Sequence, residues 1–210
     1  MNKLQDVENA VVSGKSKLVA GLVQEALDEG CSAPDILNGM INAMGIVGER
    51  FKKNEIFVPE MLVAARAMKK GVDVLKPHLA SGSAGVCGKA IIGTVAGDLH
   101  DIGKNLVAMM IESAGFEVID LGVDVPVEKF IETVKANPDV KIVGCSALLT
   151  TTMPALKSTV EALNSEDFRS HIKVMVGGAP ITQEFADEIG ADAYTPDAAS
   201  AAQKAKELVA

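Results

Sequence analysis

The chain has 210 residues, of which 48% are hydrophobic and 23% charged, and its formal net charge is −8. This composition is typical of a folded globular protein with enough apolar residues for one large core or two smaller ones, and it excludes a disordered chain. The acidic excess lies wholly in residues 81–210, and an acidic surface with one tyrosine and no tryptophan argues against a nucleic-acid partner.

The first 80 residues carry hydrophobic repeats at helical spacing. Apolar residues recur every three or four positions within residues 18–27, 36–51 and 59–75. Ser32 followed by Pro34 is typical of a helix start, and Pro59 suits the first turn of a helix, where its missing N–H is not needed. We therefore predict a four-helix bundle domain over residues 1–80.

Residues 81–88 are small and glycine-rich, which predicts a linker, and from residue 89 short apolar strands alternate with helical segments. The expected strands cover residues 89–96, 116–122, 140–148, 173–179 and 193–195. The expected helices cover residues 104–114, 127–136, 152–164, 181–189 and 198–209. Near-continuous apolar strands separated by helices indicate a parallel sheet covered on both faces.

We therefore predict an α/β domain over residues 89–210, with a five-stranded parallel sheet of flavodoxin-like, Rossmann-like order 2-1-3-4-5. In such a sheet the ligand site lies at the carboxyl ends of the strands, beside the point where the strand order reverses. The loops after the first, third and fourth strands are therefore the expected location of the chemistry.

The compartment and the membrane relation follow from the cysteines and the hydropathy. Cys31, Cys87 and Cys145 are odd in number and form no C-x-x-C pair, which favours a reducing compartment. The N-terminal residues lack the pattern of a signal peptide, and no window approaches the roughly 20 apolar residues of a membrane span. We expect a cytoplasmic protein without a membrane partner.

The loop sequences at the predicted strand ends exclude two common ligand classes. The first loop has no G-x-G-x-x-G, and the chain contains no G-x-x-x-x-G-K-[ST], so a nucleotide site of either type is not supported. A response regulator needs an aspartate at the end of the third strand, where Cys145 and Ser146 stand instead.

His100 is the most informative residue of the first loop. A lone loop histidine is commonly a surface residue that caps a helix, but Asp98 lies two positions earlier and is placed to accept the Nδ1 proton, which leaves Nε2 free for a metal. The other histidines, His78 and His171, are not at metal-ligand spacing, so we predict no independent metal site. A metal held by His100 has to bring its own equatorial ligands.

Three separated motifs resemble the signature of B12-binding domains: D-x-H-x-x-G from residue 98, S-x-L from residue 146 and G-G from residue 177. The helical half, chiefly residues 47–68, resembles the cap module of methyl-carrying B12 proteins. The chain is thus similar to corrinoid proteins of methyltransferase systems, including the cobalamin module of methionine synthase and the corrinoid proteins used with methylamines, methanol or methoxyaromatics.

The resemblance implies a cobalamin or other corrinoid cofactor whose lower axial cobalt ligand is His100, with Asp98 and Thr152 continuing a catalytic proton relay. Thr152 stands where the methionine-synthase-like pattern often has serine. The implied cofactor-binding residues of the second half are Gly97, Asp98, Leu99, His100, Asp101, Ile102, Gly103, Ser146, Leu148, Thr150, Gly177, Gly178 and Ala198. In the first half, Phe51 and Val58 match positions that cover the upper face of the corrin.

Physical reasons support several of these roles. Glycine leaves space, so Gly177 and Gly178 are expected to keep open a slot for the displaced nucleotide tail of the cofactor. Ser146 and Thr150 match residues that line this slot, and Ala198 matches a small residue packed beside it. A cap that excludes water would protect the reactive reduced cobalt, and residues 80–85 would act as its hinge.

The implied function is a methyl carrier. The cob(I)amide form takes a methyl group from a donor-specific methyltransferase, and the methylcob(III)amide form passes it to an acceptor methyltransferase that uses tetrahydrofolate or coenzyme M. A reductive activator of the corrinoid is a third expected partner. The sequence contains no recognisable substrate domain, so enzyme activity is expected only as the corrinoid component of such a system.

Three alternatives stay open at this point. The B12-binding small subunit of an adenosylcobalamin mutase shares the Asp–His motif, although an attached cap leaves little room for an adenosyl group. A B12-based sensor would need an effector such as a basic helix-turn-helix. A plain flavodoxin-like binding module would bind no corrinoid, which an absorption spectrum of the purified protein reveals.

Overall fold

The structure, a computed structural model, describes residues 3–79 and 87–210, and the chain divides into a helical unit before Cys87 and an α/β unit from Cys87 onward. The predicted hinge, residues 80–85, and most of the predicted linker, residues 81–88, lie outside the described ranges. The last two linker residues, Cys87 and Gly88, are described, and Gly88 is already the first residue of a strand. No helix within those ranges combines the length and the apolar character needed to cross a membrane.

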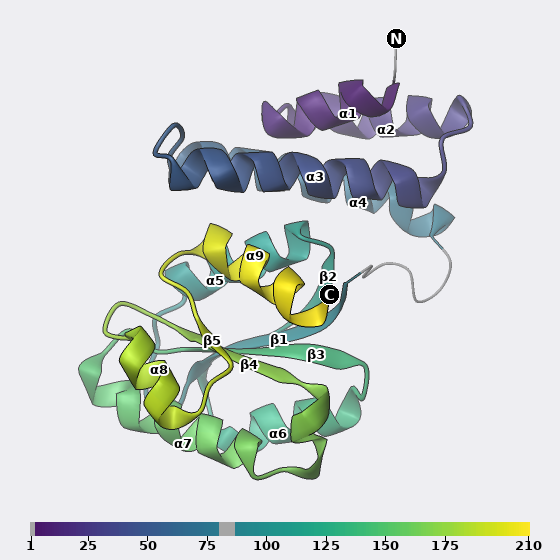
Figure 1. The fold of residues 1–210 in the computed structure, drawn as a ribbon. Helices are drawn as coiled ribbons and strands as arrows, with labels where there is room; N and C mark the ends of the chain where they lie inside the picture. The colour runs from purple at the N-terminus through teal and green to yellow at the C-terminus, as the bar shows by residue number, and fades with distance from the viewer. Residues whose placement is uncertain (1–2, 80–86) are drawn as a thin grey trace. The chain divides into compact units, whose positions relative to one another are not determined.

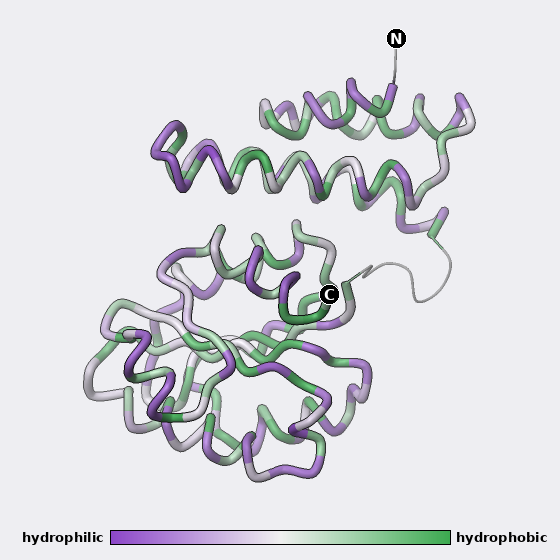
Figure 2. Tube along the Cα trace, in the orientation of Figure 1, coloured by the Kyte–Doolittle hydropathy of each residue, from purple (hydrophilic) through white to green (hydrophobic). Residues whose placement is uncertain are grey.

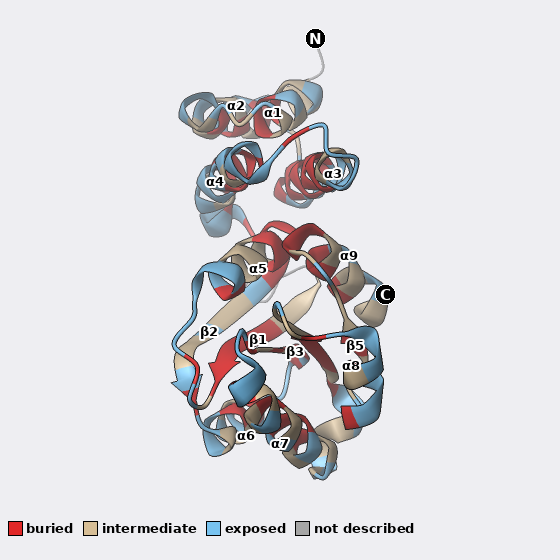
Figure 3. Ribbon diagram, turned by 90° about the vertical axis from the view of Figure 1, so that its left-hand side faces the viewer, coloured by how far each residue is buried: buried red, intermediate tan, exposed pale blue. Residues whose placement is uncertain are grey.

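The helical unit contains the predicted four α-helices, followed by a short 3₁₀ turn, η1 (Lys76–His78). The helices are α1 (Lys3–Val12), α2 (Ser16–Asp28), α3 (Ala33–Lys52) and α4 (Val58–Leu75). Ser32 caps α3, since its hydroxyl accepts a hydrogen bond from the Asp35 N–H at 3.2 Å. The apolar side of each helix faces the others, with Met40, Met61 and Met68 buried among them (Figure 3).

The α/β unit is built on a parallel sheet whose strand order, β2-β1-β3-β4-β5, confirms the prediction (Figure 1). The strands are β1 (Gly88–Val95), β2 (Phe116–Val125), β3 (Val140–Ser146), β4 (Lys173–Gly177) and β5 (Ala193–Tyr194). The helices are α5 (Ile102–Ser113), α6 (Val127–Ala136), α7 (Met153–Asn164), α8 (Gln183–Ile189) and α9 (Ala198–Val209), with 3₁₀ segments η2 (Thr150–Thr152) and η3 (Asp167–His171). Helices α5 and α9 cover one face of the sheet, and α6, α7 and α8 cover the other (Figures 1 and 3).

The central strands form the hydrophobic core of the α/β unit. Figure 2 shows hydrophobic residues along these strands, and helices around them that are hydrophobic on one side and hydrophilic on the other. Gly93 of β1 has a packing reason, because a Cβ there would lie 2.8 Å from Cζ of the buried Phe130 of α6. The glycine lets this ring pack directly against the sheet. The packing of Phe130 thus helps to hold β1, the strand that leads into the following loop.

Strand β2 is longer than predicted. The sequence places its end at Gly122, but pairing with β1 resumes at Val125 after two shifts of register. Gly122 and Asp124 have φ angles of 84° and 52°, so the strand bulges at these residues rather than stopping. Strands β3 and β4 each end two residues before their predicted ends, at Ser146 and Gly177, where the chain passes into the loops that follow them.

Candidate functional site

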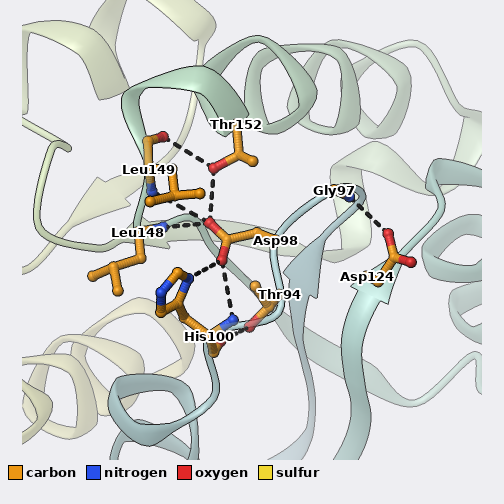
Figure 4. A network of polar contacts seen from close by, with 8 residues as sticks. All are labelled: Thr94, Gly97, Asp98, His100, Asp124, Leu148, Leu149 and Thr152. Carbon is orange, nitrogen blue, oxygen red and sulfur yellow. Dashed lines mark hydrogen bonds and ion pairs between the residues drawn. The ribbon is translucent and has the colours of Figure 1, made fainter.

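The site lies at the carboxyl ends of β1 and β3, where the chain leaves β1 toward one face of the sheet and β3 toward the other. Such a reversal leaves a crevice outside the strand ends. Asp98 and His100 stand in the loop between β1 and α5, and Leu148, Leu149 and Thr152 follow β3 (Figure 4).

Asp98 is the centre of the polar network and is completely buried, with 0% of its surface exposed. Its Oδ1 accepts hydrogen bonds from His100 Nδ1 at 2.7 Å and His100 N at 3.1 Å. Its Oδ2 accepts from Leu148 N at 2.7 Å, Leu149 N at 3.3 Å and Thr152 Oγ1 at 2.7 Å. Both carboxylate oxygens are therefore fully occupied, and the two loops are joined through one side chain.

This environment decides the charge of Asp98. Burial by itself raises its pKa, but the hydrogen bonds from Leu148, Thr152 and His100 outweigh burial and hold the pKa well below its ordinary value. An ionised carboxylate only accepts hydrogen bonds, so Nδ1 of His100 carries the proton in this contact. The lone pair of the imidazole is then on Nε2, which faces away from Asp98 (Figure 4).

The backbone around His100 is fastened as well. The hydroxyl of the buried Thr94 donates to the carbonyl oxygen of His100 at 2.9 Å. Gly97, in a left-handed conformation with φ +80°, donates its N–H to Oδ1 of Asp124 at 2.7 Å. The sequence analysis missed Thr94 and Asp124, although both lie at strand ends that the predicted strand order brings beside this loop.

Large apolar side chains are exposed in the same two loops. The exposed fractions are 72% for Leu99, 85% for Ile102, and 40% each for Leu148 and Leu149. The side chain of His100 between them is 49% exposed. A Cβ on Gly103, in the first turn of α5, would meet nothing within 4 Å. Exposed apolar side chains in the same loops as an accessible imidazole suit a flat, largely apolar ligand with a metal at its centre that accepts an electron pair.

Gly177, the last residue of β4, and Gly178, which follows it, differ in what the fold requires of them. A Cβ on Gly178 would lie 1.8 Å from the carbonyl oxygen of Ala147, and its φ of +136° strains any other residue. A Cβ on Gly177 would meet only the carbonyl oxygen of Thr195, at an ordinary 3.5 Å. Gly178 thus serves the chain's own packing, whereas the fold alone gives no such reason for Gly177. The slot for a nucleotide tail at Gly177 and Gly178 remains a prediction.

The other predicted residues of this unit surround the network. Asp101 receives two hydrogen bonds from Asn105, through its carbonyl oxygen at 2.7 Å and its Oδ2 at 3.1 Å, at the start of α5. Ser146 ends β3 between its two neighbouring strands, Thr150 is exposed at the start of η2, and Ala198 is buried as the first residue of α9.

The two residues predicted to cover a ligand lie in the helical unit. Phe51, on α3, is half-buried, and Val58, the first residue of α4, is 39% exposed. Phe57, which the sequence analysis passed over, is 63% exposed beside Val58. Their placement over a corrin remains a prediction.

Other metal-binding and nucleophilic groups are few in the described part of the chain. Within residues 3–79 and 87–210, no three His, Cys, Asp or Glu side chains gather as a group able to hold a metal ion. Burial raises the pKa of the Cys145 thiol to about 12, so a thiolate is not available beside the site at neutral pH.

Comparisons with known proteins give a consistent result. Two family profiles, each described as a B12 binding domain, match residues 88–204 and residues 3–76. The dimethylamine corrinoid protein of Methanosarcina barkeri is 46% identical over 209 residues, which cover 99% of this chain and 97% of that protein.

Two solved structures are similar over nearly the whole chain. A cobalamin-binding protein from Desulfitobacterium hafniense DCB-2 has a TM-score of 0.83 and 32% identity, covering 99% of this chain and 98% of that one. A chain in the methanol:cobalamin methyltransferase complex of Methanosarcina barkeri has a TM-score of 0.85 and 28% identity, covering 99% of this chain and 79% of that one.

These matches confirm the resemblance carried by the three motifs and by the helical half. They also identify the cofactor class as a corrinoid. The chain belongs to the family of B12-binding corrinoid proteins.

Proposed function

We propose that the chain is the methyl carrier of a methyltransferase system, with His100 as the lower axial ligand of its corrinoid cobalt and a methylamine as methyl source. The observation that carries this proposal is the contact of His100 Nδ1 with the ionised Asp98, which leaves Nε2 free in loops that also expose large apolar side chains. Dimethylamine is the first donor to test, since the relative that is 46% identical is named as a dimethylamine corrinoid protein.

The residues of the α/β unit fit a corrinoid. A single accessible imidazole nitrogen matches a metal that brings four equatorial ligands in its own ring. The exposed leucines and Ile102 match the apolar parts of a macrocycle, and the open space at Gly103 allows its close approach. Gly177, which the fold itself does not require, is left to serve the nucleotide tail.

When bound, the corrinoid supplies a cobalt centre that accepts and releases a methyl group. His100 would hold this centre through Nε2, and Asp98 fixes the tautomer and direction of the imidazole ring. Both oxygens of Asp98 already accept hydrogen bonds, so Asp98 would stay the acceptor and Nδ1 of His100 the donor whether or not a corrinoid is bound. Thr152 holds Asp98 in place through its 2.7 Å hydrogen bond and thus acts on His100 indirectly.

The proposal includes the partners and the location. A donor-specific methyltransferase supplies the methyl group, a second methyltransferase removes it for tetrahydrofolate or coenzyme M, and a reductive activator restores the cofactor. The similar chain in the methanol:cobalamin methyltransferase complex supports the first of these partners. We place all of them in the cytoplasm. Phe51 and Val58 of the helical unit would cover the upper face of the corrin between transfers.

The test uses the full chain loaded with hydroxocobalamin, reduced, and mixed with a dimethylamine methyltransferase and radiolabelled dimethylamine. We expect radiolabel on the loaded chain and on coenzyme M or tetrahydrofolate after the acceptor enzyme is added. His100→Ala should lose this transfer, and His171→Ala, outside the site, should keep it. Transfer that survives in His100→Ala would remove the histidine from the mechanism, and turnover with adenosylcobalamin instead would indicate a mutase subunit.

A further inference from the structure

The loop that carries His100 is held by hydrogen bonds from two other segments of the chain. Only one of these segments contains a family motif. On the first side, the β3–α7 connection donates three hydrogen bonds to the Asp98 side chain. On the second side, Asp124 at the end of β2 holds the backbone of the same loop (Figure 4). The second fastening has no counterpart in the three motifs.

Asp124 makes two reciprocal hydrogen bonds with the loop. Its Oδ1 accepts from Gly97 N at 2.7 Å, and its own N–H donates to the carbonyl oxygen of Asp98 at 2.9 Å. These two hydrogen bonds hold Gly97 and Asp98, the two residues immediately before Leu99 and His100. Because the turn Gly97–Asp98 sets the direction in which the chain continues, Asp124 restrains where the imidazole stands.

The backbone of Asp124 is itself unusual. Its φ is 52°, and the only other described residue besides glycine with a positive φ is Asn54. Aspartate and asparagine tolerate this left-handed conformation better than other side chains, apart from glycine. The position therefore combines a conformational requirement with a requirement for a short side-chain acceptor, and these two are separable by substitution.

The end of β2 is anchored to the far side of the loop as well. Asp120 accepts a hydrogen bond from Nζ of Lys104 at 2.6 Å and from Gly122 N at 2.9 Å. The Lys104 side chain is 2% exposed and belongs to α5, the helix that begins just after His100. Strand β2 thus contacts the loop on both sides of His100. Asp124 holds the backbone before His100, and Asp120 holds the helix after it through Lys104.

We propose that Asp124 is a positioning residue, which holds the Gly97–Asp98 turn so that Nε2 of His100 stands where it binds cobalt. This inference rests on the proposed role of His100 as the cobalt ligand. Asp124 contacts the backbone of the loop and takes no part in the Asp98–His100 contact. Its removal should therefore change how often the imidazole is bound, with Asp98 and Thr152 unchanged.

Two substitutions separate its functions. Asp124→Gly keeps the left-handed backbone and removes the acceptor, and Asp124→Asn keeps an acceptor oxygen and the tolerance for positive φ but removes the charge. Each variant is produced with ¹⁵N-labelled histidine and loaded with cob(II)alamin. The nitrogen coupling in the electron paramagnetic resonance spectrum then distinguishes a protein imidazole from the unlabelled benzimidazole of the cofactor.

We expect Asp124→Gly to shift the ratio of imidazole-bound to imidazole-free cobalt about fivefold toward the free form, the effect of losing one hydrogen bond. Asp124→Asn should restore the wild-type ratio. An unchanged ratio in Asp124→Gly, with ¹⁵N coupling lost in His100→Ala, would overturn the role of Asp124 alone. Coupling that persists in His100→Ala would overturn the proposed function instead.

A measurement on the unsubstituted chain gives an independent check that needs no cofactor. Gly97 is exposed, so its amide proton should exchange rapidly with water unless Asp124 holds it. Amide exchange followed by nuclear magnetic resonance should show protection of Gly97 in the wild-type chain and in Asp124→Asn. Exchange of the wild-type amide at the rate of an unprotected one would contradict the proposal even if Asp124→Gly failed to fold.

Discussion

The helical unit and the α/β unit bury different kinds of side chain. Within the described residues, every buried polar or charged side chain lies after Cys87, namely Thr94, Asp98, Lys104, Ser113, Thr152 and Thr159. Among its described residues, 3–79, the helical unit buries only apolar side chains and glycine, and it exposes Ile46, Phe57, Val58 and Val63. Burying a polar group costs free energy unless its hydrogen bonds are satisfied. Buried polar groups are therefore found where directional hydrogen bonds position a side chain or a loop.

This difference bears on the separate roles that we propose for the two units. The α/β unit fixes one imidazole through a buried carboxylate with defined partners, which demands accurate geometry. The helical unit offers apolar surface, whose contribution depends on area and little on direction. Substitutions in the α/β unit should therefore have large effects on stability and ligand binding that depend on the exact position. Substitutions of exposed apolar residues in the helical unit should have small, graded effects.

The largest effect is expected at Gly178. Gly178→Ala places a Cβ 1.8 Å from the Ala147 carbonyl oxygen and forces alanine to φ +136°. We expect the unloaded chain to lose at least about 3 kcal/mol of unfolding free energy, measured by urea denaturation. Gly177→Ala is the matched control and should change stability by no more than about 1 kcal/mol. Equal stabilities would refute the packing reason given for Gly178.

A smaller loss is expected when the Thr152 hydroxyl is removed. Thr152→Ala takes one donor from the buried carboxylate of Asp98, which should cost about 2 kcal/mol of stability because the acceptor is charged. Thr152→Ser keeps the hydroxyl and should lose less than about 1 kcal/mol. Urea denaturation of both unloaded variants measures the difference. If serine proved as damaging as alanine, the methyl group and not the hydrogen bond would be the important feature.

Gly177 sharpens the comparison within the site. If it keeps open the slot for the nucleotide tail, Gly177→Ala should weaken the binding of cobalamin about tenfold through overpacking. Cobinamide, which lacks the nucleotide, should bind wild type and variant alike. Titration followed by absorption gives both dissociation constants. Equal weakening for both corrinoids would remove Gly177 from the slot.

The smallest effects are expected in the helical unit. Val58→Ser should change the stability of the unloaded chain by less than about 0.5 kcal/mol, because the side chain is already 39% exposed. If Val58 covers the corrin, the reduced cofactor should be oxidised faster by air in the variant than in wild type. Stopped-flow absorption measures this rate, with the equally exposed Val63→Ser as control. Identical rates in Val58→Ser and wild type would contradict the covering role.

Local spacing predicted the parts of the site that lie close together in sequence. Asp98 and His100 are two residues apart, and their contact follows from a turn that any strand-to-helix connection of this kind makes. The strand order was predictable too, because the alternation of apolar strands and helices leaves few topologies for a parallel sheet. The hydroxyl of Thr152 was considered as a partner of Asp98 only through the family resemblance.

The contacts that were missed join residues far apart in sequence. Leu148 N reaches Asp98 across 50 positions, and Asp124 reaches Gly97 across 27. Backbone donors carry no sequence signal, since every residue except proline has one. Gly178 was predicted to keep open a slot for the nucleotide tail. The packing reason that the structure shows, the approach of Ala147, depends on two loops meeting in space.

The sequence by itself determined the order of helices and strands and the chemical type of the residue proposed as ligand, because periodicity, turn residues and short spacings act within a few positions of the chain. Only the tertiary structure decided which groups fasten that ligand: the amides after β3 on one side and Asp124 on the other. The physical reason is that satisfying a buried carboxylate, and placing a loop beside it, requires partners that only the packing of the sheet brings together.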